Sequence, residues 1–154
     1  MPVQILLLLH LVGFAVFVGG AFAEQRFMTL SGKPGLAPAV RDEYERLSAA
    51  LVTRAEVGGL FAQVVTGVLL IVLQPTFLQE HWLHAKLAAV AGLLVLSHLE
   101  MFNARRLVRA RKARGDAAAD EIAARKRRHA ALGAAVAVLV VAVLLLVTVL
   151  RGLI

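Results

Sequence analysis

The chain has 154 residues, of which 60% are hydrophobic and 18% are charged, and its formal net charge is +7. So small a polar fraction cannot cover a water-soluble globule of this size, which excludes an ordinary soluble domain. The sequence contains no cysteine, which excludes disulfides, thiolate metal sites, iron–sulfur clusters and covalent haem attachment.

Four apolar stretches follow one another along the chain: residues 3–23, 57–73, 82–102 and 130–150. Each is close to the roughly 20 residues that a helix needs to cross about 30 Å of hydrocarbon. The second stretch ends at Gln74-Pro75, because proline does not continue a helix, and residues 74–81 then connect spans two and three as an antiparallel hairpin. We therefore predict an all-α fold: an integral membrane four-helix bundle that forms a single transmembrane domain over residues 1–154.

The positive charge is confined to two segments. Ten of the 17 Lys and Arg residues lie in residues 105–128, and five lie in residues 26–54. Basic clusters that are separated by apolar runs are typical of loops between membrane spans, whereas a nucleic-acid-binding protein gathers its basic residues on one folded face. We therefore expect the lipid bilayer, and no nucleic acid, as the partner.

The same distribution predicts the orientation in the membrane. The connection at residues 74–81 carries Glu80 and no Lys or Arg. Because basic loops stay in the cytoplasm, the cytoplasmic loops are predicted at residues 24–56 and 103–129, which leaves the chain N-out and C-out. Residues 40–56 have a helical composition and are expected to extend span two into the cytoplasm. This arrangement fits a multi-pass protein of a bacterial-type inner (plasma) membrane.

A few polar side chains lie inside the predicted spans, where a charged group costs about 2.5–3.5 kcal/mol and needs a partner. His10 lies roughly 10 Å into the first span, and His84 and Lys86 lie in the first turns of the third. Because spans one and three run in the same direction, we expect these groups at similar depth. His84 and Lys86 point about 200° apart on a helix, so only one of them can share a pocket with His10.

A second group of polar residues is expected in the cytoplasmic half of the bundle. His98 follows the His84 stripe about 21 Å deeper in the third span. Its expected neighbours at that level are Glu24, Glu56, Glu100 and His129. His129 adjoins a basic run, which favours a solvated position or one near lipid phosphate.

Three further residues are candidates for a cofactor pocket. Gly13 and Phe17 lie on or near the His10 stripe, and Gln63 places an amide near the middle of the second span. Stripes of small residues are the usual interface between membrane helices, which favours helix packing over a porphyrin groove for the glycines. Lys86 also has an explanation that needs no cofactor, since its long aliphatic stem allows the ammonium to reach the membrane surface. His10 is too deep for that explanation, and neutral imidazole is a common ligand of haem iron, copper and zinc.

Two stretches carry a resemblance to a known family. The sequence from Trp82 to Leu87 (Trp-Leu-His-Ala-Lys-Leu) begins a Leu/Ala-rich span that ends in Ser97-His98, and the first span contains Leu9-His10-Leu11 and Gly19-Gly20. This combination resembles the HemJ-type membrane proteins, which belong to a wider group that includes CopD-like copper-resistance proteins. The resemblance implies a four-to-five-helix protein that binds haem b and is associated with protoporphyrinogen IX oxidation. It also implies that His10 and Lys86 are the catalytic positions.

The leading hypothesis is therefore a haem b redox protein in which His10 is an axial ligand and Lys86 or His84 completes the site. The residues expected around the cofactor are His10, His84, Lys86, His98, Gly13, Phe17 and Gln63, with His10 and His84 as the metal ligands. In an oxidase, a tetrapyrrole substrate lies between spans one and three, and electrons pass to a quinone or another redox partner. The cofactor supplies the redox chemistry, and the protein orients it.

Three alternatives stay open at this stage. A diheme electron-transfer protein uses His10 with His84 for one haem and His98 with His129 for a second. A CopD-like copper protein uses His10 and His84 together with methionines such as Met1. A structural subunit uses its polar residues to hold helices together, and a homo-oligomer is compatible with every one of these hypotheses.

Overall fold

The computed structural model describes residues 2–149, and these residues form helices joined by short connections. The α-helices are α1 (Pro2–Leu30), α2 (Pro38–Leu51), α3 (Val57–Leu73), α4 (His81–Arg114) and α5 (Ala119–Thr148). A π-helical turn, Val52–Glu56, joins α2 to α3, so that residues 38–73 form one continuous helix. Four helices are long and apolar enough to cross a membrane. The predicted all-α, four-helix architecture is therefore confirmed.

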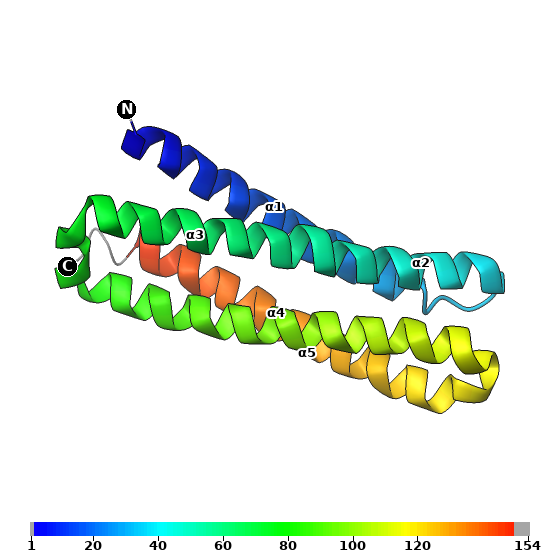
Figure 1. The fold of residues 1–154 in the computed structure, drawn as a ribbon. Helices are drawn as coiled ribbons and strands as arrows, with labels where there is room; N and C mark the ends of the chain where they lie inside the picture. Colours follow the sequence, from blue (N-terminus) through cyan, green and yellow to red (C-terminus); the bar gives the residue numbers. More distant parts are fainter. Residues whose placement is uncertain (1, 150–154) are drawn as a thin grey trace.

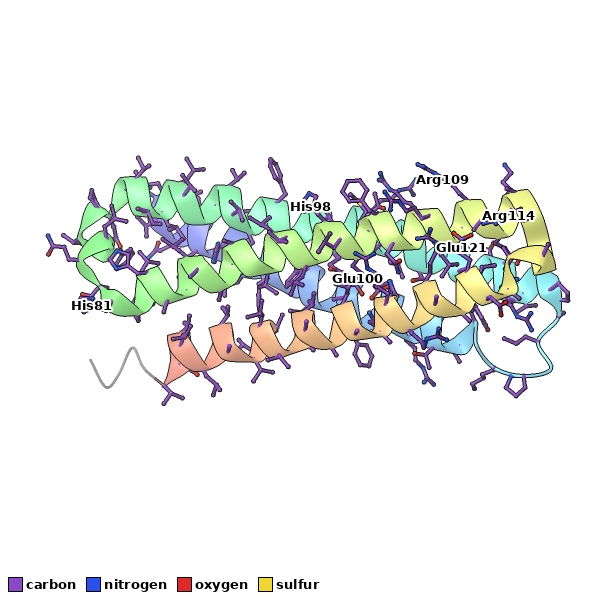
Figure 2. All side chains as sticks on the ribbon, turned by 90° about the horizontal axis from the view of Figure 1, so that it is seen from below. His81, His98, Glu100, Arg109, Arg114 and Glu121 are labelled. Carbon is purple, nitrogen blue, oxygen red and sulfur yellow. The ribbon has the colours of Figure 1, made fainter. Side chains whose placement is uncertain are left out.

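The four long helices are arranged as two pairs (Figure 1). One pair is α1 with the continuous α2–α3 helix, the other is α4 with α5, and the two pairs approach each other where α2 meets α4. The connections that follow α1 and α4 lie at the same end of the bundle, which we call the charged end because Arg109, Arg114 and Glu121 lie there (Figure 2). The turn between α3 and α4 lies at the opposite end, as the predicted hairpin requires.

The segments predicted as loops, residues 24–56 and 103–129, are largely helical, which corrects that prediction. Helix α4 continues to Arg114 and α5 begins at Ala119, so the connection between them is only Gly115–Ala118. Gly115 has a φ of 53°, a conformation that glycine adopts readily. Charged residues end the membrane-crossing part of a helix, but alanine, arginine and lysine favour the helical backbone and let it continue into water. The expected helix at residues 40–56 is present as part of the continuous helix, whereas residue 150 of the last predicted span lies outside the described residues.

The apolar side chains form a core between the helix pairs and also cover much of the outside. Buried core residues near the middle of the bundle are Phe17, Leu60, Leu93, Val136, Val140 and Val143. On the outside, Phe61, Val72 and Val138 are 66%, 66% and 68% exposed. Such an outer surface suits hydrocarbon, because a helix whose backbone is internally hydrogen-bonded can present apolar side chains to lipid.

Small residues bring α1 and α3 into close contact. A Cβ atom on Gly59 would lie 2.6 Å from the backbone nitrogen of Phe17 and 2.9 Å from the carbonyl oxygen of Gly13. A Cβ on Gly13 would lie 3.1 Å from the backbone nitrogen of Gln63. Gly13, a candidate for the cofactor pocket, thus lies at a helix–helix contact of the small-residue type.

Substitution of Gly59 by alanine is expected to destabilise the bundle, because the new methyl group meets backbone atoms that cannot move aside individually. Overpacking of this kind costs about 1–3 kcal/mol. Gly58→Ala is the matched control, since a Cβ there has no atom within 4 Å and brings the same gain in helix propensity. Thermal unfolding in detergent should show a lower midpoint for Gly59→Ala only. Equal midpoints for the two variants would contradict the proposed close contact.

Candidate functional site

His10 is held by α3 in a defined orientation. Its Nδ1 atom lies 2.9 Å from the backbone oxygen of Gln63 and 3.1 Å from the hydroxyl of Thr66. A Cβ on Gly67 would lie 3.2 Å from Cε1 of the ring, so the glycine leaves room for the imidazole. Because a carbonyl oxygen can only accept a hydrogen bond, Nδ1 carries the proton, and in the neutral ring Nε2 keeps its lone pair.

Lys86 is the member of the predicted pair that lies on the His10 side. It is half-buried on α4 and within electrostatic range of His10. His84 is exposed, and its ring centroid lies 6.5 Å from that of His81. The structure thus brings Lys86, but not His84, toward His10, as expected from the angle between these residues on one helix.

His98 and His129 lie in different surroundings, so the structure does not bring together the ligand pair of a second haem. His98 is exposed, and its Nδ1 atom donates to the carbonyl oxygen of Leu94 at 2.7 Å. His129 is fully buried on α5, which corrects the expectation that it is solvated or near lipid phosphate, because it packs inward against Glu24 rather than following the basic run outward. Phe17 is also fully buried, in the apolar core, and Gln63 holds His10 through its backbone oxygen.

A second polar group lies toward the charged end and draws one residue from each membrane-crossing helix. We call it the Glu–His cluster, and its members are Glu24, Glu56, Glu100 and His129, all of which are at most 1% exposed. The Nε2 atom of His129 lies 2.6 Å from Oε2 of Glu24 and 3.5 Å from Oε1 of Glu100. The sequence predicts these residues near His98, but the packing turns His98 outward, so that it is not part of the cluster.

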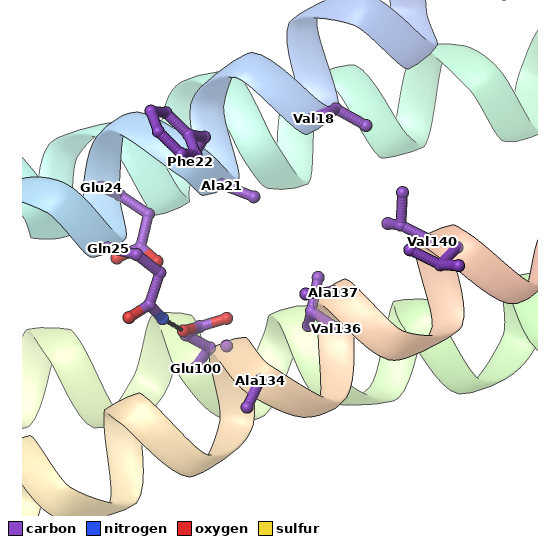
Figure 3. A pocket seen from close by; sticks show the side chains of 12 residues that line it. Val18, Ala21, Phe22, Glu24, Gln25, Glu100, Ala134, Val136, Ala137 and Val140 are labelled. Atoms are coloured by element: carbon purple, nitrogen blue, oxygen red, sulfur yellow. Dashed lines mark hydrogen bonds between the residues drawn. The ribbon is translucent and has the colours of Figure 1, made fainter.

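Neighbouring polar side chains hold the Glu–His cluster in place. The hydroxyl of Ser48 donates to Oε2 of Glu24 at 3.0 Å, and the amide of Gln25 donates to Glu100 (Figure 3). Gly133 is needed for this second contact, because a Cβ there would overlap the Gln25 amide. The serine, glutamine and glycine therefore fix the direction of two carboxyl groups.

An apolar pocket of about 390 Å³ ends at these groups. Val18, Ala21 and Phe22 of α1 face residues of α5 across it, and Glu24, Gln25 and Glu100 lie at one end (Figure 3). The pocket gives the Glu–His cluster an apolar approach from between α1 and α5.

A separate ionic group lies beyond the membrane-crossing segments, at the charged end. Glu45 of α2 is 1% exposed and lies 3.1 Å from Arg111 and 2.8 Å from Lys126. Burial disfavours the ionised carboxylate, but the hydrogen bonds from Arg111 and Lys126 outweigh this effect and hold the pKa of Glu45 below its ordinary value. This group joins α2, α4 and α5, and its role is structural.

The fold, the surroundings of His10 and the Glu–His cluster define an α-helical, multi-pass integral membrane protein with titratable side chains inside the bundle. Such residues are expensive in a membrane and commonly mark functional sites. The sequence model of a family described as predicted integral membrane protein (DUF2269) matches residues 4–151, and the chain belongs to this family. No curated protein and no solved structure matches it.

Proposed function

We propose that this chain is a haem b-binding redox protein of the membrane, with His10 as an axial ligand of the iron. The observation that carries the proposal is the hydrogen bond from Nδ1 of His10 to the backbone oxygen of Gln63. Histidines that bind metals commonly donate the other ring N–H to a carbonyl or carboxylate, which fixes the tautomer and directs the lone pair. Nε2 of His10 has the state that an axial ligand needs.

Lys86 is the second residue of the proposed site. It lies on α4 and His10 lies on α1, so the two residues belong to different helix pairs, and the ammonium is near enough to act electrostatically on the imidazole. In the proposal, Lys86 completes the iron coordination or binds a porphyrin propionate. The resemblance to HemJ-type proteins implies that the same two positions are essential. Bound haem supplies one-electron redox chemistry, and the chain supplies ligation, orientation and an apolar surrounding.

Absorption spectroscopy of the detergent-purified protein tests the proposal. A Soret band together with a pyridine haemochrome assay of one haem per chain is the expected result. Two haems per chain would favour the diheme alternative, and bound copper without haem would favour the CopD-like alternative. A preparation from haem-replete cells that contains neither cofactor would overturn the proposed function.

Oxidation of protoporphyrinogen IX is the more specific activity that the resemblance suggests. Membranes that contain the chain should then form protoporphyrin IX faster than control membranes do, which porphyrin fluorescence measures directly. An equal rate in both membranes would reject the oxidase activity and leave the haem-binding proposal to the spectroscopic test.

A further inference from the structure

The Glu–His cluster is separate from the proposed haem site, because Glu24 follows His10 by about 21 Å along α1. We propose that the cluster binds one divalent transition-metal ion of the Mn²⁺, Fe²⁺ or Zn²⁺ class. The ligands are one carboxylate oxygen each from Glu24 and Glu100 and the Nε2 atom of His129. In the proposal, the nearby buried carboxylate of Glu56 moves in as the fourth donor when the ion binds. The site does not depend on haem binding.

The geometry of the cluster is close to that of a metal site. One ligand atom each from Glu24, Glu100 and His129 lies within 4.8 Å of the others. Two ligand atoms that are each about 2.1 Å from one ion are at most about 4.2 Å apart, so only a small movement of the side chains is needed. Helical bundles build carboxylate and imidazole metal sites in this way, from inward-facing residues of several helices.

Glu56 provides an independent observation that points to a ligand. Its side chain is 0% exposed, and neither carboxylate oxygen has a partner in hydrogen-bonding geometry, although the buried hydroxyl of Ser97, which also lacks such a partner, is a polar neighbour. It lies within electrostatic range of Glu24 and His129, although its oxygens are not among the ligand atoms that lie within 4.8 Å of one another. A buried carboxylate without hydrogen bonds is unfavourable, and coordination of a cation removes that cost. The position of Glu56 at the end of the π-helical turn also fits a binding role, because such turns are frequent at functional sites.

The charge of the cluster favours a cation. In the part of the chain that the structure describes, the ion pairs of Glu24 and Glu100 are both with His129. Burial in a water-poor interior disfavours three ionised glutamates, so the carboxyl groups are neutralised either by protons or by a bound cation. A divalent ion displaces these protons, including the one between His129 and Glu24. Oxygen and imidazole donors without a thiolate favour Mn²⁺, Fe²⁺ or Zn²⁺ over Cu⁺.

The test is a titration of the purified, chelator-treated full chain with Mn²⁺ and, separately, with Zn²⁺, followed by calorimetry. The expected result is one ion per chain for at least one of the two metals. Glu56→Gln and Glu100→Gln should each weaken that binding at least about tenfold. Glu43→Gln is the control, because it removes an exposed carboxylate that is paired with Arg46, and it should bind as the wild type does.

Thermal unfolding separates the loss of a ligand from the loss of the fold. Saturating metal should raise the unfolding temperature of the wild type and of Glu43→Gln, because a ligand stabilises the state that binds it. The same metal should have a smaller effect on Glu56→Gln, a variant whose amide can still form a hydrogen bond with the Ser97 hydroxyl and which is expected to keep a wild-type helical circular dichroism spectrum. No stoichiometric binding in the wild type, or wild-type affinity in both glutamine variants, would overturn the metal site. Because the added ions are not haem iron, either result leaves the proposed function to its own spectroscopic test.

Discussion

Replacement of His10 by alanine is expected to abolish the Soret band of the purified protein and to reduce its haem content to background. The Nδ1 atom of the imidazole donates to the Gln63 carbonyl, which leaves the lone pair of Nε2 available to bind iron. Non-covalent haem that loses its axial ligand also loses most of its affinity. The measurement is the ratio of Soret to protein absorbance after purification.

His84→Ala is the matched control, because it removes a histidine from the same end of the bundle that is exposed and turned toward His81. It should retain the band. A second variant, Thr66→Val, removes the weaker partner of Nδ1 and keeps the Gln63 carbonyl, so haem should remain while its reduction potential shifts. Wild-type haem content in His10→Ala would remove His10 from the ligand set.

The number and order of the membrane-crossing helices follow from the sequence, because each apolar stretch has the length that the hydrocarbon layer requires. The extension of span two before residue 57 was also predictable from its helical composition. The continuation of α4 to Arg114 was not, since a run of basic residues is compatible with either a loop or a helix. Here the packing of α4 against α5 beyond the membrane decides in favour of the helix.

The buried face of α4 could not be chosen from hydrophobic periodicity, because this helix is apolar on all sides within the membrane. The sequence predicts His98 and Glu100 at the inner polar level, but only Glu100 faces inward, together with Leu93 and Ser97. One signal was present: Glu24, Glu56 and His129 each lie directly next to a predicted span, at the end expected in the cytoplasm. Polar residues at the same end of several spans are predicted to lie at the same depth in the membrane. Their side-chain distances, which decide whether they form a site, cannot be predicted from the sequence.

Replacement of Glu45 by glutamine is expected to destabilise the charged end by about 2 kcal/mol at neutral pH. The carboxylate accepts hydrogen bonds from both nitrogens of the Arg111 fork and lies 2.8 Å from Lys126, contacts that a neutral amide cannot replace. The value lies below the usual cost of breaking a buried ion pair, because Arg111 and Lys126 are 14% and 21% exposed and regain water. Glu43→Gln should change stability little, since its pair with Arg46 is exposed.

The effect of Glu45→Gln should depend on pH in a defined direction. The hydrogen bonds from Arg111 and Lys126 hold the pKa of Glu45 below the ordinary value of 4.5, so the carboxylate stabilises the fold fully above that pH. This contribution is lost as the pH falls through the lowered pKa, because the carboxyl is then protonated in the folded and the unfolded chain. The difference in unfolding midpoint between wild type and Glu45→Gln should therefore be constant from pH 8 to about pH 5.5 and shrink under stronger acid. A difference that grows with acid would mean that the pKa of Glu45 is raised in the folded protein, and would contradict the stabilising contacts with Arg111 and Lys126.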